Sequence, residues 1–128
     1  MPKTLNKILY VEDEQDIQAI AQIALEAVGG FTLKTFTNGY DAIEEISSYK
    51  PDLILLDVMM PGIDGPSTLK KIRKNPEFEH TPAIFMTAKV QPEEVSELRE
   101  NGAIDVIAKP FDPMELANTI KKIWENLD

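Results

Sequence analysis

Short apolar runs alternate along the chain with longer segments in which apolar residues recur every three or four positions. The runs are rich in β-branched and aromatic residues, as buried strands are, and lie at residues 7–11, 31–36, 52–56, 82–86 and 106–108. The intervening segments have the spacing of amphipathic helices, at residues 15–28, 39–49, 66–74, 92–101 and from Asp112 to 127. Five strand–helix pairs predict a parallel sheet with helices on both faces.

Capping and turn residues support these helix boundaries. Asn38 can cap the second helix, Pro66 suits the first turn of the third, and Asp112 can cap the last. Gly29 and Gly102 follow the first and fourth helices, where glycine commonly ends a helix. Two apolar stripes are predicted to face the core, one in the first helix (Ile17, Ile20, Ala21, Ala24, Val28) and one in the last (Leu116, Ile120, Ile123, Leu127).

Composition narrows the class of protein. The 128 residues suffice for one domain, and no repeat or linker divides them. The 22 acids exceed the 13 bases and give a formal charge of −9, which argues against broad contact with nucleic acid or an anionic membrane. The absence of cysteine excludes disulfides, thiolate metal sites and thiol catalysis. No apolar run approaches the roughly 20 residues that cross a bilayer, so we expect a cytosolic protein.

The residues at the ends of the predicted strands carry the candidate chemistry. Glu12 and Asp13 follow the first strand, Asp57 the third, Thr87 the fourth and Lys109 the fifth. Parallel sheets bind ligands at the carboxyl ends of their strands, so these residues should converge. Each alone has a simpler interpretation, as a solvated turn residue, a strand threonine or a loop lysine. Their joint placement favours a site.

Three neighbouring carboxylates repel one another, and a hard divalent cation relieves this repulsion. Mg²⁺ prefers oxygen ligands and commonly binds one or two carboxylates together with phosphate oxygens. Lys109 and Thr87 would supply a counter-charge and a hydrogen-bond donor for a phosphoryl group. Asp57, which closes an apolar run, could then act as a nucleophile and become an aspartyl phosphate.

These motifs resemble those of the receiver domain of two-component response regulators, the CheY-like family. The matching segments are ILYVEDE with its acid pair, PDLILLDVMMPGIDG around Asp57, PAIFMTA with Thr87, and KPF with Lys109. The resemblance extends over about residues 7–127, the core of a single domain at 1–128. It implies an α/β, flavodoxin-like three-layer sandwich of five helices and five parallel strands in the order 2-1-3-4-5.

The resemblance also implies a role for each site residue. Asp57 would be the phosphoacceptor. Mg²⁺, or Mn²⁺ in its place, would be held by Glu12, Asp13, Asp57 and the backbone carbonyl of Met59. Lys109 would pair with Asp57, favour its ionised form and later bind the phosphoryl group.

Further positions follow from the same resemblance. Thr87 would donate its hydroxyl to a phosphoryl oxygen, and the small Ala88 would leave access to the site open. The peptide bond between Lys109 and Pro110 would be cis.

Three positions bear on phosphate lifetime and signal output. Met59 and Lys89 lie two residues after Asp57 and Thr87, so by resemblance they would flank the path of the attacking water and tune the phosphate lifetime. The alternative is that both simply face solvent. Val106 departs from the family pattern, which has Tyr or Phe there. Because valine cannot reproduce the inward swing of a ring, the switch would be weaker or differently built.

The implied function is that of a stand-alone receiver, which is not an enzyme beyond its own phosphorylation and slow autodephosphorylation. A histidine kinase or a histidine phosphotransfer protein would phosphorylate it. A downstream protein would bind the surface of helix 4, strand 5 and helix 5, with no direct contact to nucleic acid or membrane. The alternatives are a phosphorelay intermediate, a phosphate sink, or the receiver fragment of a larger regulator or hybrid kinase.

Other classes fit the sequence less well. Phosphatases with an aspartate nucleophile place a second Asp two residues on, where this chain has Met59. A flavin-binding domain needs a phosphate cradle after the first strand, and VEDEQD there would repel the anion. The complete residue set argues against an inactive receiver. Four bases suggest a nucleic-acid patch but suit a helix C-terminus better; they are Lys70, Lys71, Arg73 and Lys74.

Overall fold

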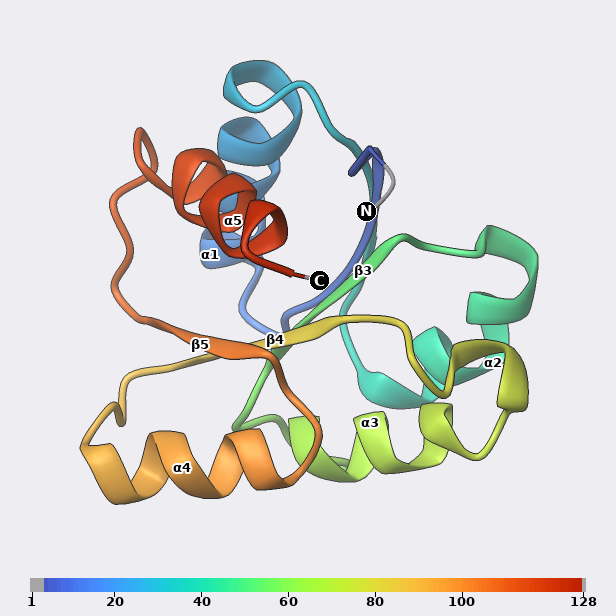
Figure 1. Cartoon of the computed structure of the whole chain (residues 1–128). Helices are drawn as coiled ribbons and strands as arrows, with labels where there is room; N and C mark the ends of the chain where they lie inside the picture. The colour runs from blue at the N-terminus through green and yellow to red at the C-terminus, as the bar shows by residue number, and fades with distance from the viewer. Residues whose placement is uncertain (1–3, 128) are drawn as a thin grey trace.

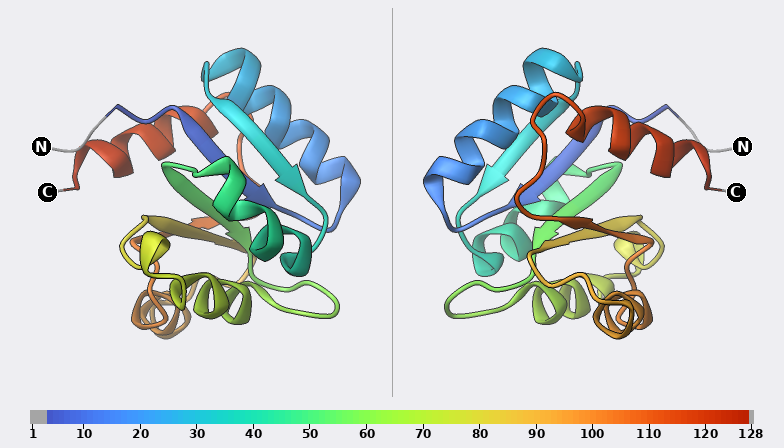
Figure 2. Two further views of the ribbon diagram at one scale, coloured as in Figure 1. Left: turned by 90° about the vertical axis from the view of Figure 1, so that its right-hand side faces the viewer. Right: turned by 90° about the vertical axis from the view of Figure 1, so that its left-hand side faces the viewer.

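A computed structural model describes residues 4–127 and shows a five-stranded sheet between two layers of helices (Figure 1). The strands are β1 (Lys7–Val11), β2 (Thr32–Phe36), β3 (Leu53–Asp57), β4 (Ala83–Thr87) and β5 (Asp105–Ala108). They lie in the order β2-β1-β3-β4-β5, and all neighbours pair in parallel (Figure 2). The predicted strand order is confirmed. The predicted domain range 1–128 also includes residues 1–3 and 128, which lie outside the described residues.

The helices divide between the two faces of the sheet. One face carries α1 (Gln15–Gln22), its π-helical continuation η1 (Ile23–Val28) and α5 (Leu116–Glu125). The other carries α2 (Gly39–Tyr49), α3 (Gly65–Arg73) and α4 (Pro92–Glu100), with a short 3₁₀ turn, η2 (Pro76–Phe78), after α3. The predicted three-layer sandwich is therefore confirmed. Within the described part of the chain, we find no helix that has both the length and the apolar character of a membrane span.

Alternation along the buried strands builds a separate core on each face. In β1, Ile8 and Tyr10 belong to the core under α1 and α5, whereas Leu9 and Val11 belong to the core under α2, α3 and α4. This alternation follows from the two-residue period of a strand. All five residues of β3 are buried, so its carboxyl end carries Asp57 into a largely water-free environment.

The first helix differs from its prediction in the face that it buries. Ala21 and Ala24 are buried as expected, but Ile20 and Val28 are 46% and 47% exposed. Leu25 is fully buried instead. The physical reason is the π-helical segment, whose turns hold more residues than an α-helix and rotate the buried stripe. Ile17, also predicted to face the core, is half-buried.

The last helix begins later than predicted. Oδ1 of Asp112 accepts a hydrogen bond from the backbone N–H of Met114 at 2.9 Å, so Asp112 caps a turn and regular helix starts at Leu116. The predicted inward positions Leu116 and Ile120 are buried. Trp124 is also buried and belongs to the core under α1 and α5.

Candidate functional site

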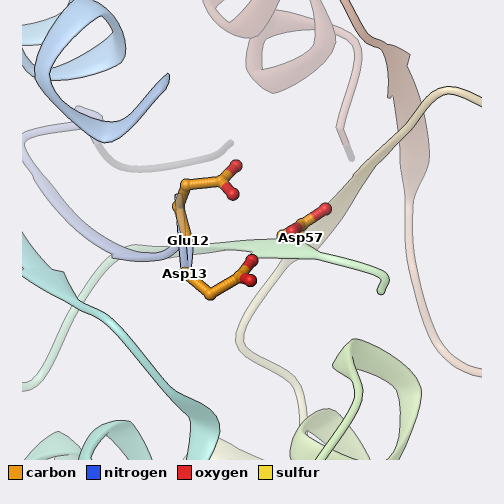
Figure 3. Close-up of side chains that lie close together, drawn as sticks. All are labelled: Glu12, Asp13 and Asp57. Atoms are coloured by element: carbon orange, nitrogen blue, oxygen red, sulfur yellow. The ribbon is translucent and has the colours of Figure 1, made fainter. Parts of the chain in front are cut away.

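Three carboxylates converge at the carboxyl ends of β1 and β3. Glu12 and Asp13 follow β1, and Asp57 is the last residue of β3. One oxygen from each carboxylate lies within 4.8 Å of the others, and Figure 3 shows the three side chains gathered at this edge. Glu12 is fully buried, Asp57 is almost so, and Asp13 is half-buried. The predicted convergence of these residues is thus observed.

Lys109 links two of these carboxylates. Its Nζ donates to Oε1 of Glu12 and to Oδ1 of Asp57, each at 3.1 Å. The lysine directly follows β5, and its backbone N–H donates to the carbonyl of Thr87 at 2.9 Å, which fixes the start of its loop. The Lys109–Pro110 peptide bond is cis. The contact with Asp57 was expected from the resemblance, whereas the contact with Glu12 was not.

Burial dominates the electrostatics of the phosphoacceptor position. Burial and the nearby charge of Glu12 raise the pKa of Asp57 from 3.8 to about 7, although Lys109 acts in the opposite direction. Burial alone would lower the pKa of Lys109, but its hydrogen bonds to the two carboxylates and their charges raise it. Lys109 therefore favours an ionised Asp57, as the resemblance implies, but burial and Glu12 outweigh it when no divalent cation is bound.

Thr87 lies at the end of β4, one strand beyond Asp57, and is buried. Its Oγ1 accepts a hydrogen bond from the backbone N–H of Lys89 at 3.1 Å. This contact leaves the hydroxyl hydrogen available to a further acceptor. Ala88 and Lys89 are exposed, and the side chain of Met59 is 67% exposed.

Gly65 brings the start of α3 against the site. A Cβ at this position would lie 2.3 Å from the backbone carbonyl oxygen of Asp57, so any larger residue would push α3 away. Asp64 caps the helix by accepting from the backbone N–H of Ser67 at 2.8 Å. From sequence, Asp64 and Gly65 predict only a turn.

Two further residues hold Glu12 and were not identified from the sequence. The hydroxyl of Tyr10 lies 3.4 Å from Oε1 of Glu12, and both side chains are fully buried. Gln18 donates through Nε2 to the backbone carbonyls of Glu12 and Phe36, at 3.3 and 3.2 Å. The available signal was the strand period, because residues 10 and 12 point to the same face.

Val106 lies half-buried in β5, opposite Phe85 of β4. It packs against the core under α2, α3 and α4. A side-chain ion pair connects the neighbouring Asp105 to Arg99 of α4 at 3.0 Å. The structure therefore contains a direct link between β5 and α4 beside this position.

The donor set suits a hard divalent cation. Carboxylate oxygens are the only metal-ligating side-chain atoms that Glu12, Asp13 and Asp57 offer, and their separation lets one ion contact all three. Mg²⁺ and Mn²⁺ prefer such oxygen ligands. The residues present thus fit the metal that the sequence predicts.

Comparisons with known proteins agree with this geometry. The family model for the response regulator receiver domain matches residues 8–121. The phosphate regulon transcriptional regulatory protein PhoB of Rhizobium meliloti is 36% identical over 117 residues, which are 91% of this chain and 51% of that protein. The alkaline phosphatase synthesis transcriptional regulatory protein PhoP of Bacillus subtilis is 37% identical over 117 residues, 91% of this chain and 48% of that protein.

A solved structure matches over nearly its full length. The chemotaxis protein CheY4 of Vibrio cholerae superposes with a TM-score of 0.86 and 28% identity, covering 94% of this chain and 99% of that one. By contrast, the chain spans about half the length of the two curated relatives.

Proposed function

Because this chain belongs to the response regulator receiver domain family, we propose that Asp57 accepts a phosphoryl group from a histidine kinase or a histidine phosphotransfer protein. Receivers are signalling proteins, and we propose that this one catalyses only its own phosphorylation and slow autodephosphorylation. The observation that carries the proposal is the contact of Lys109 with both Asp57 and Glu12, beside a three-carboxylate cluster. A nucleophile, a cation and metal ligands are thereby within reach of one phosphoryl group.

Magnesium, or manganese in its place, would be held by Glu12, Asp13, Asp57 and the backbone carbonyl of Met59. When bound, the ion supplies positive charge that offsets the repulsion between the acceptor carboxylate and an incoming phosphoryl group. The oxygen-only donor set supports this assignment.

The protein groups have distinct parts in the proposed transfer. The Asp57 carboxylate attacks the phosphorus atom and forms an aspartyl phosphate. Lys109, which contacts the carboxylate beforehand, pairs with a phosphoryl oxygen afterwards. Thr87 donates its free hydroxyl hydrogen to another phosphoryl oxygen, and the small Ala88 keeps the approach open.

Met59 and Lys89 are proposed to tune the lifetime of the aspartyl phosphate. Both are exposed, and both lie two residues beyond a site residue. A cavity of about 430 Å³ is lined in part by Met59, Lys89 and Thr87, which places the two side chains beside the phosphoryl position. Water that attacks the phosphate would pass between them.

We further propose that the output is a protein contact through α4, β5 and α5, without direct nucleic-acid or membrane contact. The chain could act as a stand-alone cytosolic receiver, as a phosphorelay intermediate or phosphate sink, or as the receiver part of a larger regulator or hybrid kinase. The names of PhoB and PhoP as transcriptional regulatory proteins, with this chain spanning half their length, favour the last alternative over a sink.

Incubation with acetyl phosphate and Mg²⁺, followed by intact mass measurement, tests the proposal. We expect one phosphoryl adduct in the native protein, none when EDTA is present during loading, and none in Asp57→Asn. Asp16→Asn is the matched control, because Asp16 is an exposed acid of α1 and should leave the adduct unchanged. An adduct that persists in Asp57→Asn would overturn the assignment.

A further inference from the structure

An apolar cavity of about 360 Å³ lies beside the phosphoacceptor site. It is formed by Ile17 and Ile20 of α1 and by the loop that follows β5, including Phe111 and two prolines. Lys109 and Ala88 complete its lining, so Lys109 is the one charged residue among the lining residues that the structure describes. A cavity of this size is at the small end of the range that holds organic ligands, roughly 300–1,000 Å³.

The cavity and the phosphoacceptor share Lys109. Its Nζ is 3.1 Å from Oδ1 of Asp57, while the same residue lines the cavity. The surroundings of Asp57 therefore differ by direction: towards Asp13 the site is anionic, and towards Ile20 and Phe111 it is apolar. A phosphodonor with an anionic head and an apolar leaving group matches this polarity, because its head can meet Lys109 while its tail avoids the carboxylates.

We propose that this cavity is a leaving-group subsite that makes the domain prefer acyl phosphates with apolar acyl chains over acetyl phosphate. The inference rests on the proposed phosphorylation of Asp57. In the transfer, the bond between phosphorus and the acyl oxygen breaks as a bond between phosphorus and an Asp57 oxygen forms. The acyl group leaves as a carboxylate with the electron pair of the broken bond, so the total charge is unchanged and no proton or further reactant is needed.

The expected size of the preference follows from burial of the acyl chain. Each methylene that moves from water into an apolar site improves kcat/KM by up to about 4-fold. Butyryl phosphate carries two more methylenes than acetyl phosphate, and the cavity is open to solvent on one side. We therefore expect butyryl phosphate to react roughly 5- to 15-fold faster at subsaturating donor.

The first experiment compares acetyl and butyryl phosphate at equal concentration with Mg²⁺, with the rate of adduct formation followed by intact mass. Acetate and butyrate are carboxylates of nearly equal basicity, so the two donors have nearly equal intrinsic reactivity. A clear preference for butyryl phosphate supports the proposal. Equal rates from the two donors would overturn it while leaving the proposed phosphorylation of Asp57 intact. Failure of both donors would instead count against that function.

The second experiment locates the preference. Ile20→Ala removes cavity lining from a side chain that is already 46% exposed, so the fold should persist, and the ratio of butyryl to acetyl rates should fall to about 2-fold or less. Ile23→Ala is the matched control, since Ile23 belongs to the same helical segment, is 64% exposed and does not line the cavity. Its ratio should equal that of the native protein. A ratio that falls equally in both variants, or in neither, contradicts the subsite.

Discussion

The hydroxyl of Tyr10 lies 3.4 Å from Oε1 of Glu12, the same carboxylate oxygen that accepts a hydrogen bond from Lys109. Oε2 of this carboxylate accepts from the backbone N–H of Glu14 at 3.2 Å. A fully buried carboxylate is therefore held from three directions before any metal binds. Groups that fix a metal-ligating side chain commonly affect metal affinity as much as they affect its position.

Tyr10→Phe should therefore weaken Mg²⁺ binding without unfolding the domain. The substitution keeps the buried ring and removes only the hydroxyl, so Glu12 loses one of its three donors. Because the contact is long for an O–H···O hydrogen bond, we expect an effect at the low end for such partners, a 3- to 10-fold rise in the Kd for Mg²⁺. Isothermal titration calorimetry measures this Kd directly.

Tyr49→Phe is the control for the loss of a tyrosine hydroxyl. The hydroxyl of Tyr49 donates to backbone carbonyls of β1 and β2, including that of Thr32 at 3.0 Å, and has no contact with the carboxylate cluster. Its removal should leave the Kd for Mg²⁺ unchanged. Equal affinities in Tyr10→Phe and the native protein would show that the Tyr10 hydroxyl does not help to position Glu12.

The raised pKa of Asp57 predicts that the metal-free protein loses stability as pH rises. Its pKa is about 7 in the folded protein against an ordinary 3.8, so between these values the folded protein keeps a proton that the unfolded chain has released. The free energy of unfolding then falls across this range, with the contribution fully present below about pH 4 and lost above about pH 7. Asparagine does not titrate, so Asp57→Asn removes this slope.

Urea unfolding in EDTA at pH 5 and pH 8 measures the effect. The stability advantage of Asp57→Asn over the native protein should be larger at pH 8 than at pH 5. Saturating Mg²⁺ should reduce the advantage at pH 8, because a ligand that binds the folded state stabilises it. An advantage that does not change with pH would contradict the raised pKa of Asp57.

Lys109→Met should destabilise the metal-free domain at pH 8. The substitution retains much of the aliphatic stem but leaves Glu12 and Asp57 without the ammonium that bonds to both. Removing one partner from a buried ionic group costs about 3 kcal/mol of unfolding free energy. Urea unfolding measures the loss, and Lys70→Met, at an exposed position of α3, is the control. Similar losses in the two variants would mean that the Lys109 bridge contributes little to stability.

Arg73→Ala should destabilise the fold without changing the Kd for Mg²⁺. Nη1 of Arg73 donates to the carbonyls of Phe78 and Thr81, and Nη2 donates to that of Gly102 at 3.1 Å. The guanidinium thus joins α3 to η2 and to the loop before β5. Loss of these bonds should lower the unfolding free energy by about 2–3 kcal/mol.

Arg73→Lys should restore little of this stability, because one ammonium group cannot reproduce the planar fork of the guanidinium. Lys74→Ala serves as the control for the loss of positive charge near the end of α3, since Lys74 is exposed. Urea unfolding and calorimetry together separate the structural role of Arg73 from the site. A raised Kd for Mg²⁺ in Arg73→Ala would show that the two are coupled.

The fold and the convergence of the site could be predicted because both follow from repeating patterns. Alternating strands and helices specify a parallel sheet, and such a sheet brings its strand ends to one edge. Glu12, Asp13, Asp57 and Lys109 therefore meet even though up to 97 positions separate them. No long-range pairing had to be known in advance.

The missed features depend on side-chain reach and local helix geometry. Nothing in the apolar pattern distinguishes an α-helical from a π-helical turn, so Val28 looked as suitable for burial as Leu25. The bridge from Lys109 to Glu12 depends on the length of two flexible side chains. Tyr10 reads as an apolar strand residue, and its hydroxyl acquires a role only because Glu12 points to the same face.

Phosphorylation should be transmitted to α4 more strongly in Val106→Tyr than in the native protein. Val106 has no ring that could change position when Thr87 engages a phosphoryl group, and it borders a hollow of about 420 Å³ that is open enough to accept one. Backbone amide NMR shifts before and after loading with acetyl phosphate and Mg²⁺ measure the response. Shifts around Asp57 should be alike in both proteins, whereas those around Arg99 should be larger in the variant. Equally large changes at Arg99 in the native protein would show that the signal reaches α4 without a ring at position 106.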